Sequence, residues 1–284
     1  MVPPSFSDLG KDARDLLFKK FYFGLYNIHC ETKKNDIEFK SNLSDGPRPN
    51  KMYFDLQEKL TFPQYGLAIT KKWTSNNVVD GEIVFEDKLF DGLKQTFQIS
   101  RDPFKKCFNA NLIHSFRNDR VNSNVEMFFK SAIPDLSPSL VFCYQGYLVG
   151  ADVKLDCTNQ ILQKANFAVG YTVQDFTFHG LIANWGKQFS ANMFQRITDR
   201  LHIAGSITWK RVPDEVVWAV GSQYILDSQN KHSIKCKLDH LNQISLAFTT
   251  YLSKGKLQCY GYIYGELRWL LFFLWEFYQW MPTQ

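Results

Sequence analysis

His29 and Cys30 are adjacent, and a histidine beside a cysteine could begin a metal site or an activated thiolate. The other histidines are dispersed over different predicted strands and add no partner, at positions 114, 179, 202, 232 and 240. The six cysteines are never spaced CxxC, which predicts free thiols and no zinc site. HExxH, P-loop, GxSxG and GxGxxG patterns are also missing. We therefore expect no enzyme, no metal site and no required cofactor.

Basic residues are the remaining candidates for binding chemistry. The chain has 33 lysines and arginines against 28 carboxylates, a formal net charge of +5. These cations alternate with carboxylates instead of forming a basic block, so we expect no nucleic-acid partner. A lumen with excess positive charge would instead favour anions.

The N-terminal stretch predicts a short amphipathic helix that Asp8 could cap. One apolar stripe would consist of Leu9, Ala13, Leu16 and Leu17. The rest of its surface would carry Lys11, Asp12, Arg14, Asp15 and Lys19. By themselves these charges are typical of a solvated helix face, and the helix could also pack outside a soluble domain.

From about residue 24 onward, apolar and polar residues alternate in short segments separated by turn-like residues, which predicts β-strands. In Ala151–Cys157 every second residue is apolar and the others are charged. The same pattern recurs at 52–57, 93–100, 201–209 and 233–239. The 25 Phe, 13 Tyr and 7 Trp suit half-buried strands and the aromatic girdles of membrane barrels.

The uniform alternation favours a transmembrane β-barrel over a soluble sandwich, which usually has edge strands and long loops. At about ten residues per strand plus a turn, residues 25–284 allow about 19 strands. A helical membrane protein is not expected, because the longest apolar run has seven residues, Trp269–Trp275. The first residues lack a basic region before an apolar core, so we expect no cleaved secretory signal.

Several segments resemble the eukaryotic voltage-dependent anion channels in one register from residue 2 to about 257. The matching segments are Val2–Asp15, Tyr65–Trp73, Gly92–Phe97, Gly146–Gly150 and Asn166–Tyr171. Tyr224–Ser228 followed by Lys235 looks like the beginning of the family's C-terminal signature and then diverges.

The resemblance implies an all-β, 19-stranded barrel in the mitochondrial outer membrane, with the N-terminal helix inside the pore. Residues 1–24 would be the helix and hinge, and 25–284 the barrel. The channel would pass small ions and anionic metabolites such as ATP and ADP. Lys11, Arg14 and Lys19 match pore-lining helix positions, and Lys11 and Lys19 also match nucleotide contacts.

The resemblance also implies binding partners. ATP or NAD would bind in the lumen, and the NAD contacts would fall at Gln243, Ile244 and Ser245, where the local match is poor. Other implied partners are membrane lipid, a second copy of the chain, and cytosolic docking proteins.

Three features depart from the family pattern: one residue, the hinge and the C-terminal segment. Lys71 stands where the family commonly has a membrane-facing glutamate linked to gating and lipid handling. It shares a face with Leu67, Ile69 and Trp73, so we expect it to point at lipid. The glycine-rich hinge is reduced to Gly24, which predicts weaker gating by helix motion. At the C-terminus, Leu267–Phe277 breaks the alternation that a closing strand requires.

These departures motivate an alternative from another functional class. The barrel could be non-conducting or cation-preferring and act as a docking or lipid-handling scaffold in the same membrane. A soluble all-β binding protein is the third reading, and it differs from both barrels in needing no detergent for extraction.

Overall fold

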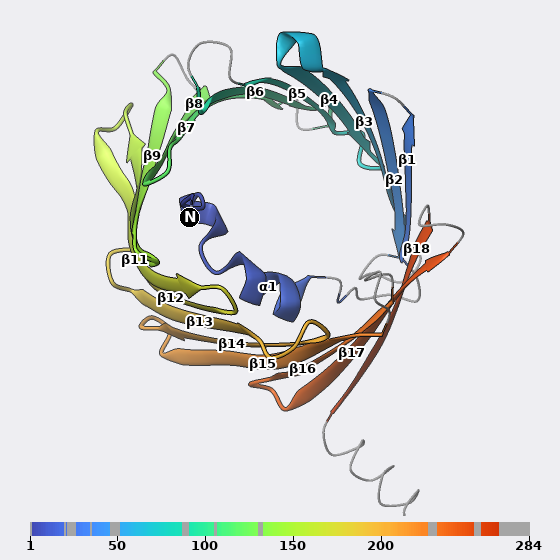
Figure 1. The fold of residues 1–284 in the computed structure, drawn as a ribbon. Coiled ribbons are helices and arrows are strands. Elements are labelled where there is room, and N and C mark those ends of the chain that lie inside the picture. The colour runs from blue at the N-terminus through green and yellow to red at the C-terminus, as the bar shows by residue number, and fades with distance from the viewer. Residues whose placement is uncertain are drawn as a thin grey trace, which may run out of the picture.

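The structure is a computed structural model of the chain. It describes residues 2–19, 21, 27–34, 36–45, 52–86, 91–104, 107–129, 133–226, 232–252 and 257–266. These residues form a β-barrel with a helical segment inside it (Figure 1). The sequence expectation of an all-β barrel with an internal N-terminal helix is therefore confirmed.

Two helical elements precede the barrel, the 3₁₀ helix η1 (Phe6–Asp8) and the helix α1 (Lys11–Phe18). The first nine strands are β1 (Asn27–Lys34), β2 (Ile37–Asp45), β3 (Met52–Phe62), β4 (Leu67–Thr74), β5 (Val79–Glu86), β6 (Leu93–Asp102), β7 (Cys107–Arg117), β8 (Val121–Phe129) and β9 (Asp135–Tyr144). The next nine are β10 (Tyr147–Asp156), β11 (Ile161–Val173), β12 (Phe176–Ala183), β13 (Gln188–Arg196), β14 (Leu201–Lys210), β15 (Glu215–Ile225), β16 (Ser233–Asp239), β17 (Gln243–Leu252) and β18 (Leu257–Glu266). A second 3₁₀ helix, η2, spans Pro63–Tyr65.

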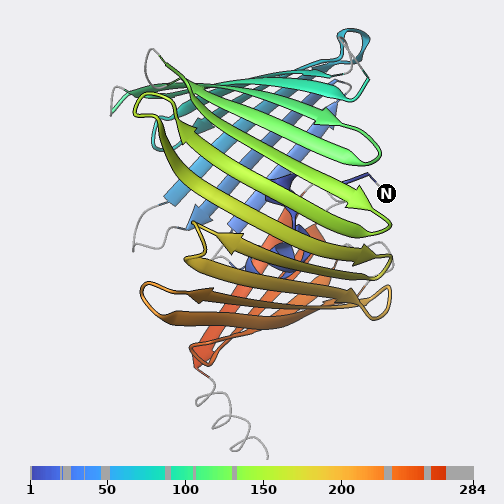
Figure 2. The same ribbon diagram turned by 90° about the vertical axis from the view of Figure 1, so that its left-hand side faces the viewer.

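Each strand pairs antiparallel with the next, and the strands run obliquely around the barrel (Figure 2). The sheet of the described residues has 18 strands, close to the expected count of about 19. It closes where β1 meets β18, also antiparallel, through four residue pairs from Asn27↔Tyr260 to Cys30↔Leu257. An even number of strands permits this closure, because β1 and β18 then run in opposite directions.

Strand alternation gives the barrel two chemically different faces. On β14, Ile207 and Trp209 are exposed on the outer face. Ala204, which precedes them on the same strand, is buried on the inner face. The outer face is the one that we expect to meet lipid, and its exposed aromatic and branched side chains recur on the other strands. Neither the length nor the hydropathy of any helix in the described part of the chain suffices for a membrane-spanning helix.

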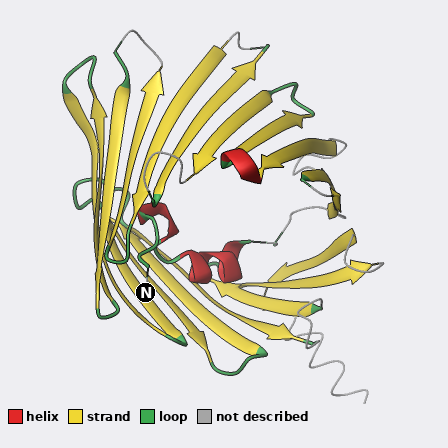
Figure 3. Cartoon of the chain, turned by 45° about the horizontal axis from the view of Figure 1, so that its top comes forward, coloured by secondary structure: helices red, strands yellow, loops and turns green. Residues whose placement is uncertain are grey.

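The N-terminal segment, defined as residues 2–19, lies inside the barrel (Figure 3). Two clusters of buried residues lie between this segment and the inner wall. The predicted apolar stripe is confirmed, since Leu9, Ala13, Leu16 and Leu17 are all buried. The prediction that Asp8 caps the helix is wrong. The N-cap of α1 is Gly10, whose φ of 69° lies in the left-handed region that favours glycine. Asp8 instead ends η1.

Candidate functional site

The N-terminal segment is seated on the inner wall through two apolar clusters. Leu9 packs with Val141, Cys143, Leu148 and Ala168 near β9–β11. Further along, Ala13, Leu16 and Leu17 pack with Ala204 and Ala219, supported by Phe194. The wall is made of small residues here, so the helix backbone can approach it closely.

Gly221 shows how close this approach is. A methyl group built at Gly221 would lie 2.9 Å from Leu17 Cδ2 and 2.7 Å from the carbonyl oxygen of Cys236. Both distances are shorter than a normal van der Waals contact. Glycine at this position therefore leaves room for the backbone of β16 and for the Leu17 side chain of α1.

Polar contacts fix the start of the N-terminal segment. Asn122 Nδ2 donates a buried hydrogen bond of 3.0 Å to the carbonyl oxygen of Pro3. Arg14 folds back along its own segment, and its guanidinium donates to the carbonyl oxygens of Ser7 and Leu9. Arg14 thus ties η1 to α1, a structural contact that the sequence did not indicate.

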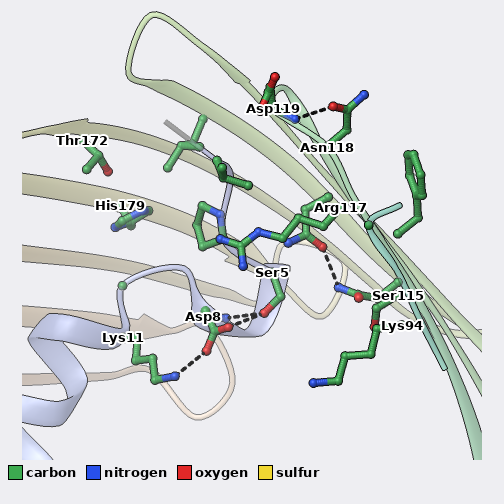
Figure 4. Close-up of a pocket in the computed structure, with 18 of the residues that line it drawn as sticks. Ser5, Asp8, Lys11, Lys94, Ser115, Arg117, Asn118, Asp119, Thr172 and His179 are labelled. Atoms are coloured by element: carbon green, nitrogen blue, oxygen red, sulfur yellow. Dashed lines mark hydrogen bonds and ion pairs between the residues drawn. The ribbon is translucent and has the colours of Figure 1, made fainter. Parts of the chain in front are cut away.

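Asp8 is the centre of a small charged group in the lumen (Figure 4). Ser5 Oγ donates to Asp8 Oδ2 at 2.7 Å, and Lys11 Nζ donates to Asp8 Oδ1 at 3.0 Å. Partial burial raises the pKa of Asp8, but the hydrogen bonds from Ser5 and Lys11 and the charges of Lys11 and Arg14 outweigh it, so the pKa lies below its ordinary value. The same hydrogen bond raises the pKa of Lys11.

The structure brings the three predicted pore-lining cations together on one segment inside the barrel. Lys11 and Lys19 are exposed on its free side, and Lys19 Nζ lies 3.2 Å from Asp15 Oδ2. Arg14 is partly buried through its contacts with backbone carbonyls. Lys11 and Lys19 are thus placed to meet solutes in the lumen, whereas their role in binding nucleotides stays a prediction.

A cavity of about 980 Å³ lies between the N-terminal segment and the β5–β8 side of the barrel (Figure 4). Three cations and five carboxylates line it, namely Lys11, Lys94 and Arg117 with Asp8, Asp12, Glu86, Asp91 and Asp119. Such a lining can hold ions of either sign at different points of the passage.

Lys71 and its neighbour Trp73 are exposed on the same, outer face of β4, and contact of Lys71 with lipid stays a prediction. Glu58 of β3 lies directly opposite Lys71 in the strand register. Glu58 continues the alternating series Met52, Phe54 and Leu56, so it also lies on the outer face. Glu58 was not predicted as a site residue, although its place on an otherwise apolar face was a usable signal in the sequence.

The predicted NAD stretch lies at the start of β17. Alternation places Gln243 and Ser245 on the inner face and Ile244 on the outer face. Ser245 is only 1% exposed, and it is paired in register with Lys237 of β16. The three residues therefore do not form one lumenal contact surface in this structure, and NAD binding stays a prediction.

The remaining expectations concern the hinge, the closing strand and metals. Gly24, the proposed boundary between residues 24 and 25, and Leu267–Phe277 lie outside the described residues. Within the described ranges, no group of three or more His, Cys, Asp or Glu side chains is arranged to hold a metal ion.

Comparisons with known proteins address the family. The family model described as eukaryotic porin matches residues 2–258. The "Voltage-dependent anion-selective channel" of Drosophila melanogaster is 31% identical over 256 residues, 90% of each chain. The human "Non-selective voltage-gated ion channel VDAC1" is 31% identical over 255 residues, 89% of each chain. A solved mutant porin of Rh. blastica covers 84% of this chain and 96% of its own at 7% identity and a TM-score of 0.47, too distant for a functional conclusion. The chain belongs to the eukaryotic porin family.

Proposed function

We propose that the chain forms a voltage-dependent channel of the mitochondrial outer membrane, through which small ions and anionic metabolites such as ATP and ADP diffuse. The observation that carries this proposal is the N-terminal segment, which is seated inside the barrel and presents Lys11 and Lys19 to the lumen. The fruit-fly relative is named a voltage-dependent anion-selective channel, and the human relative a non-selective voltage-gated ion channel.

Transport in such a channel needs no bond to be made or broken. The helix narrows the passage, and lysines on its free side lower the electrostatic energy of an anion at the narrowing. ATP, ADP or NAD would be held there weakly, so that each can leave again. The apolar outer face would meet membrane lipid. A second copy and cytosolic docking proteins remain predictions from the family resemblance.

Single-channel recording in a planar bilayer with a salt gradient tests this proposal. We expect discrete conductance with a reversal potential that indicates anion preference. Lys11→Gln combined with Lys19→Gln should reduce the preference, because it removes two positive charges from the lumen. Arg14→Gln is tested separately, since Arg14 also holds the turn between η1 and α1.

Lys71→Gln is the control, because the same substitution removes one positive charge from the outer face and none from the lumen. It should leave the reversal potential unchanged. An unchanged preference in the double variant would contradict the assignment of Lys11 and Lys19 to the pore.

One observation favours a second candidate, a cation-preferring barrel. Carboxylates outnumber lysines and arginines five to three along the cavity beside the N-terminal segment. The sign of the reversal potential decides between the two channels. A folded, inserted protein that never conducts would instead support a docking or lipid-handling scaffold.

A further inference from the structure

The inner face of β16 carries two lysines directed at the C-terminal end of α1. Lys235 is only 5% exposed although it ends in an ammonium group. Its Nζ donates hydrogen bonds to the carbonyl oxygens of Asp15 (2.8 Å), Leu16 (3.5 Å) and Lys19 (3.4 Å). Lys237 is the next inward residue of the same strand. A wall strand more than 200 residues away in sequence therefore caps the helix.

The end of α1 needs such a partner. The last carbonyls of any helix have no partner within it, and the helix dipole places partial negative charge there. Lys19, the C-cap residue, is already extended, with φ −88° and ψ 138°. A helix of eight residues is also marginal by itself in water, so its stability depends on the wall.

Lys237 makes a weaker contact with the same helix end. Its Nζ lies 5.7 Å from the ring centroid of Phe18 and 5.1 Å from that of Phe21. Phe18 is 52% exposed, and cation–π contacts at exposed sites contribute little. Lys237 thus differs from Lys235 in burial and in the kind of contact, while it shares the strand, the face and the charge.

We propose that Lys235 is the latch that holds α1 against the wall, so that α1 leaves its seat only when the hydrogen bonds of this ammonium are broken. If movement of α1 closes the channel, α1 is the gate and Lys235 is the residue that positions it. The link from docking to gating rests on the proposed channel function, whereas the latch itself concerns only the position of α1.

Release of the helix has an electrostatic consequence. In the docked state the Lys235 ammonium is covered by the carbonyls that it bonds. Undocking uncovers it, which adds one exposed positive charge to the inner wall. The undocked channel should therefore attract anions more strongly than an undocked channel with a neutral residue at this position.

Hydrogen–deuterium exchange by mass spectrometry on the full-length protein in lipid nanodiscs tests the latch without relying on conduction. Lys235→Met keeps an unbranched side chain, one atom shorter than lysine, and removes its charge and donors. We expect the amides of residues 11–19 to exchange at least about tenfold faster than in the unchanged protein, because a charged hydrogen-bond donor is lost. Lys237→Met is the matched control and should change exchange much less. Lys235→Arg should restore slow exchange.

The strands β4–β6 serve as an internal reference for folding. Should Lys235→Met accelerate exchange there as well, Lys235→Gln, which keeps one donor group, replaces it. Exchange of residues 11–19 at the unchanged rate in a folded Lys235 variant would overturn the latch. So would equal acceleration by Lys237→Met.

Recordings in planar bilayers then examine the link to gating. Fast exchange together with a lower voltage for closure supports Lys235 as the gate latch. In another outcome, the Lys235 variant exchanges fast but neither the variant nor the unsubstituted protein conducts. This outcome supports the latch and contradicts the proposed channel function. Fast exchange with unaltered gating overturns the gate role.

Discussion

The inner wall of the barrel has two regions whose inward side chains differ in size and polarity. At β14 and β15 the inward residues are small, with Ala204, Ala219 and Gly221 beneath the helix. Across β3–β7 the inward residues are longer and polar, as at Gln57, Lys72, Glu82, Gln98 and Asn111, and they line an open cavity of about 360 Å³. Both regions have the same strand alternation. We infer from this difference that the size of the inward side chains determines where α1 packs on the wall and where space remains for water and ions.

The largest expected effect comes from breaking the seat at Leu17, which is fully buried. Leu17→Ala should weaken docking of α1 by about 2–5 kcal/mol, since the cavity left behind adds to the lost burial. Hydrogen exchange of residues 11–19 measures the change. Phe18→Ala, at the exposed neighbouring position, is the control and should have a much smaller effect on exchange. Equal effects would mean that the small-residue wall is not the seat.

The outer side of the polar region gives the second prediction. Replacing Glu58 by Leu leaves the Lys71 ammonium without its cross-strand neighbour on the lipid-facing side and should lower the free energy of unfolding by about 2 kcal/mol. The double change Glu58→Leu with Lys71→Leu should restore or exceed the original stability. Urea unfolding from lipid vesicles measures both. A double variant as unstable as Glu58→Leu would refute the pairing.

Adding a single methyl group at either of two glycines on neighbouring strands tests how closely α1 approaches the wall. Gly221→Ala should destabilise the β15–β16 pairing and the docking of α1 together by about 1–3 kcal/mol, because the new methyl group would meet the backbone of β16 and Leu17. Gly205→Ala is the matched control on β14, where an added methyl group meets no atom within 4 Å. Exchange of the α1 amides distinguishes the two. Similar rates in both variants would show that the close approach at Gly221 is unimportant.

The smallest effect concerns pH. Because the pKa of folded Asp8 is below its ordinary value, its carboxylate stabilises the segment above the ordinary pKa, and this contribution is lost as pH falls through the lowered pKa. The open-state lifetime in bilayers should therefore shorten as pH drops below about 4. Asp8→Asn should remove this step. An identical pH profile in Asp8→Asn would assign the step to other carboxylates.

Much of the fold could be predicted because alternation is a local signal. The stripe of Leu9, Ala13, Leu16 and Leu17 indicated which helix face would be buried, and the series through Lys71 indicated its outward direction. The contacts of Arg14 and Lys235 could not be predicted, since both bond to backbone carbonyls, which carry no sequence signature. The sequence predicted Asp8 and not Gly10 as the N-cap of the helix. In the structure the Asp8 carboxylate accepts hydrogen bonds from Ser5 and Lys11 instead.

Antiparallel closure between β1 and β18 has a consequence for membrane sidedness. Because the 18 described strands alternate in direction, the start of β1 at Asn27 and the end of β18 at Glu266 lie at the same rim of the sheet. The same aqueous compartment therefore adjoins both of these strand ends.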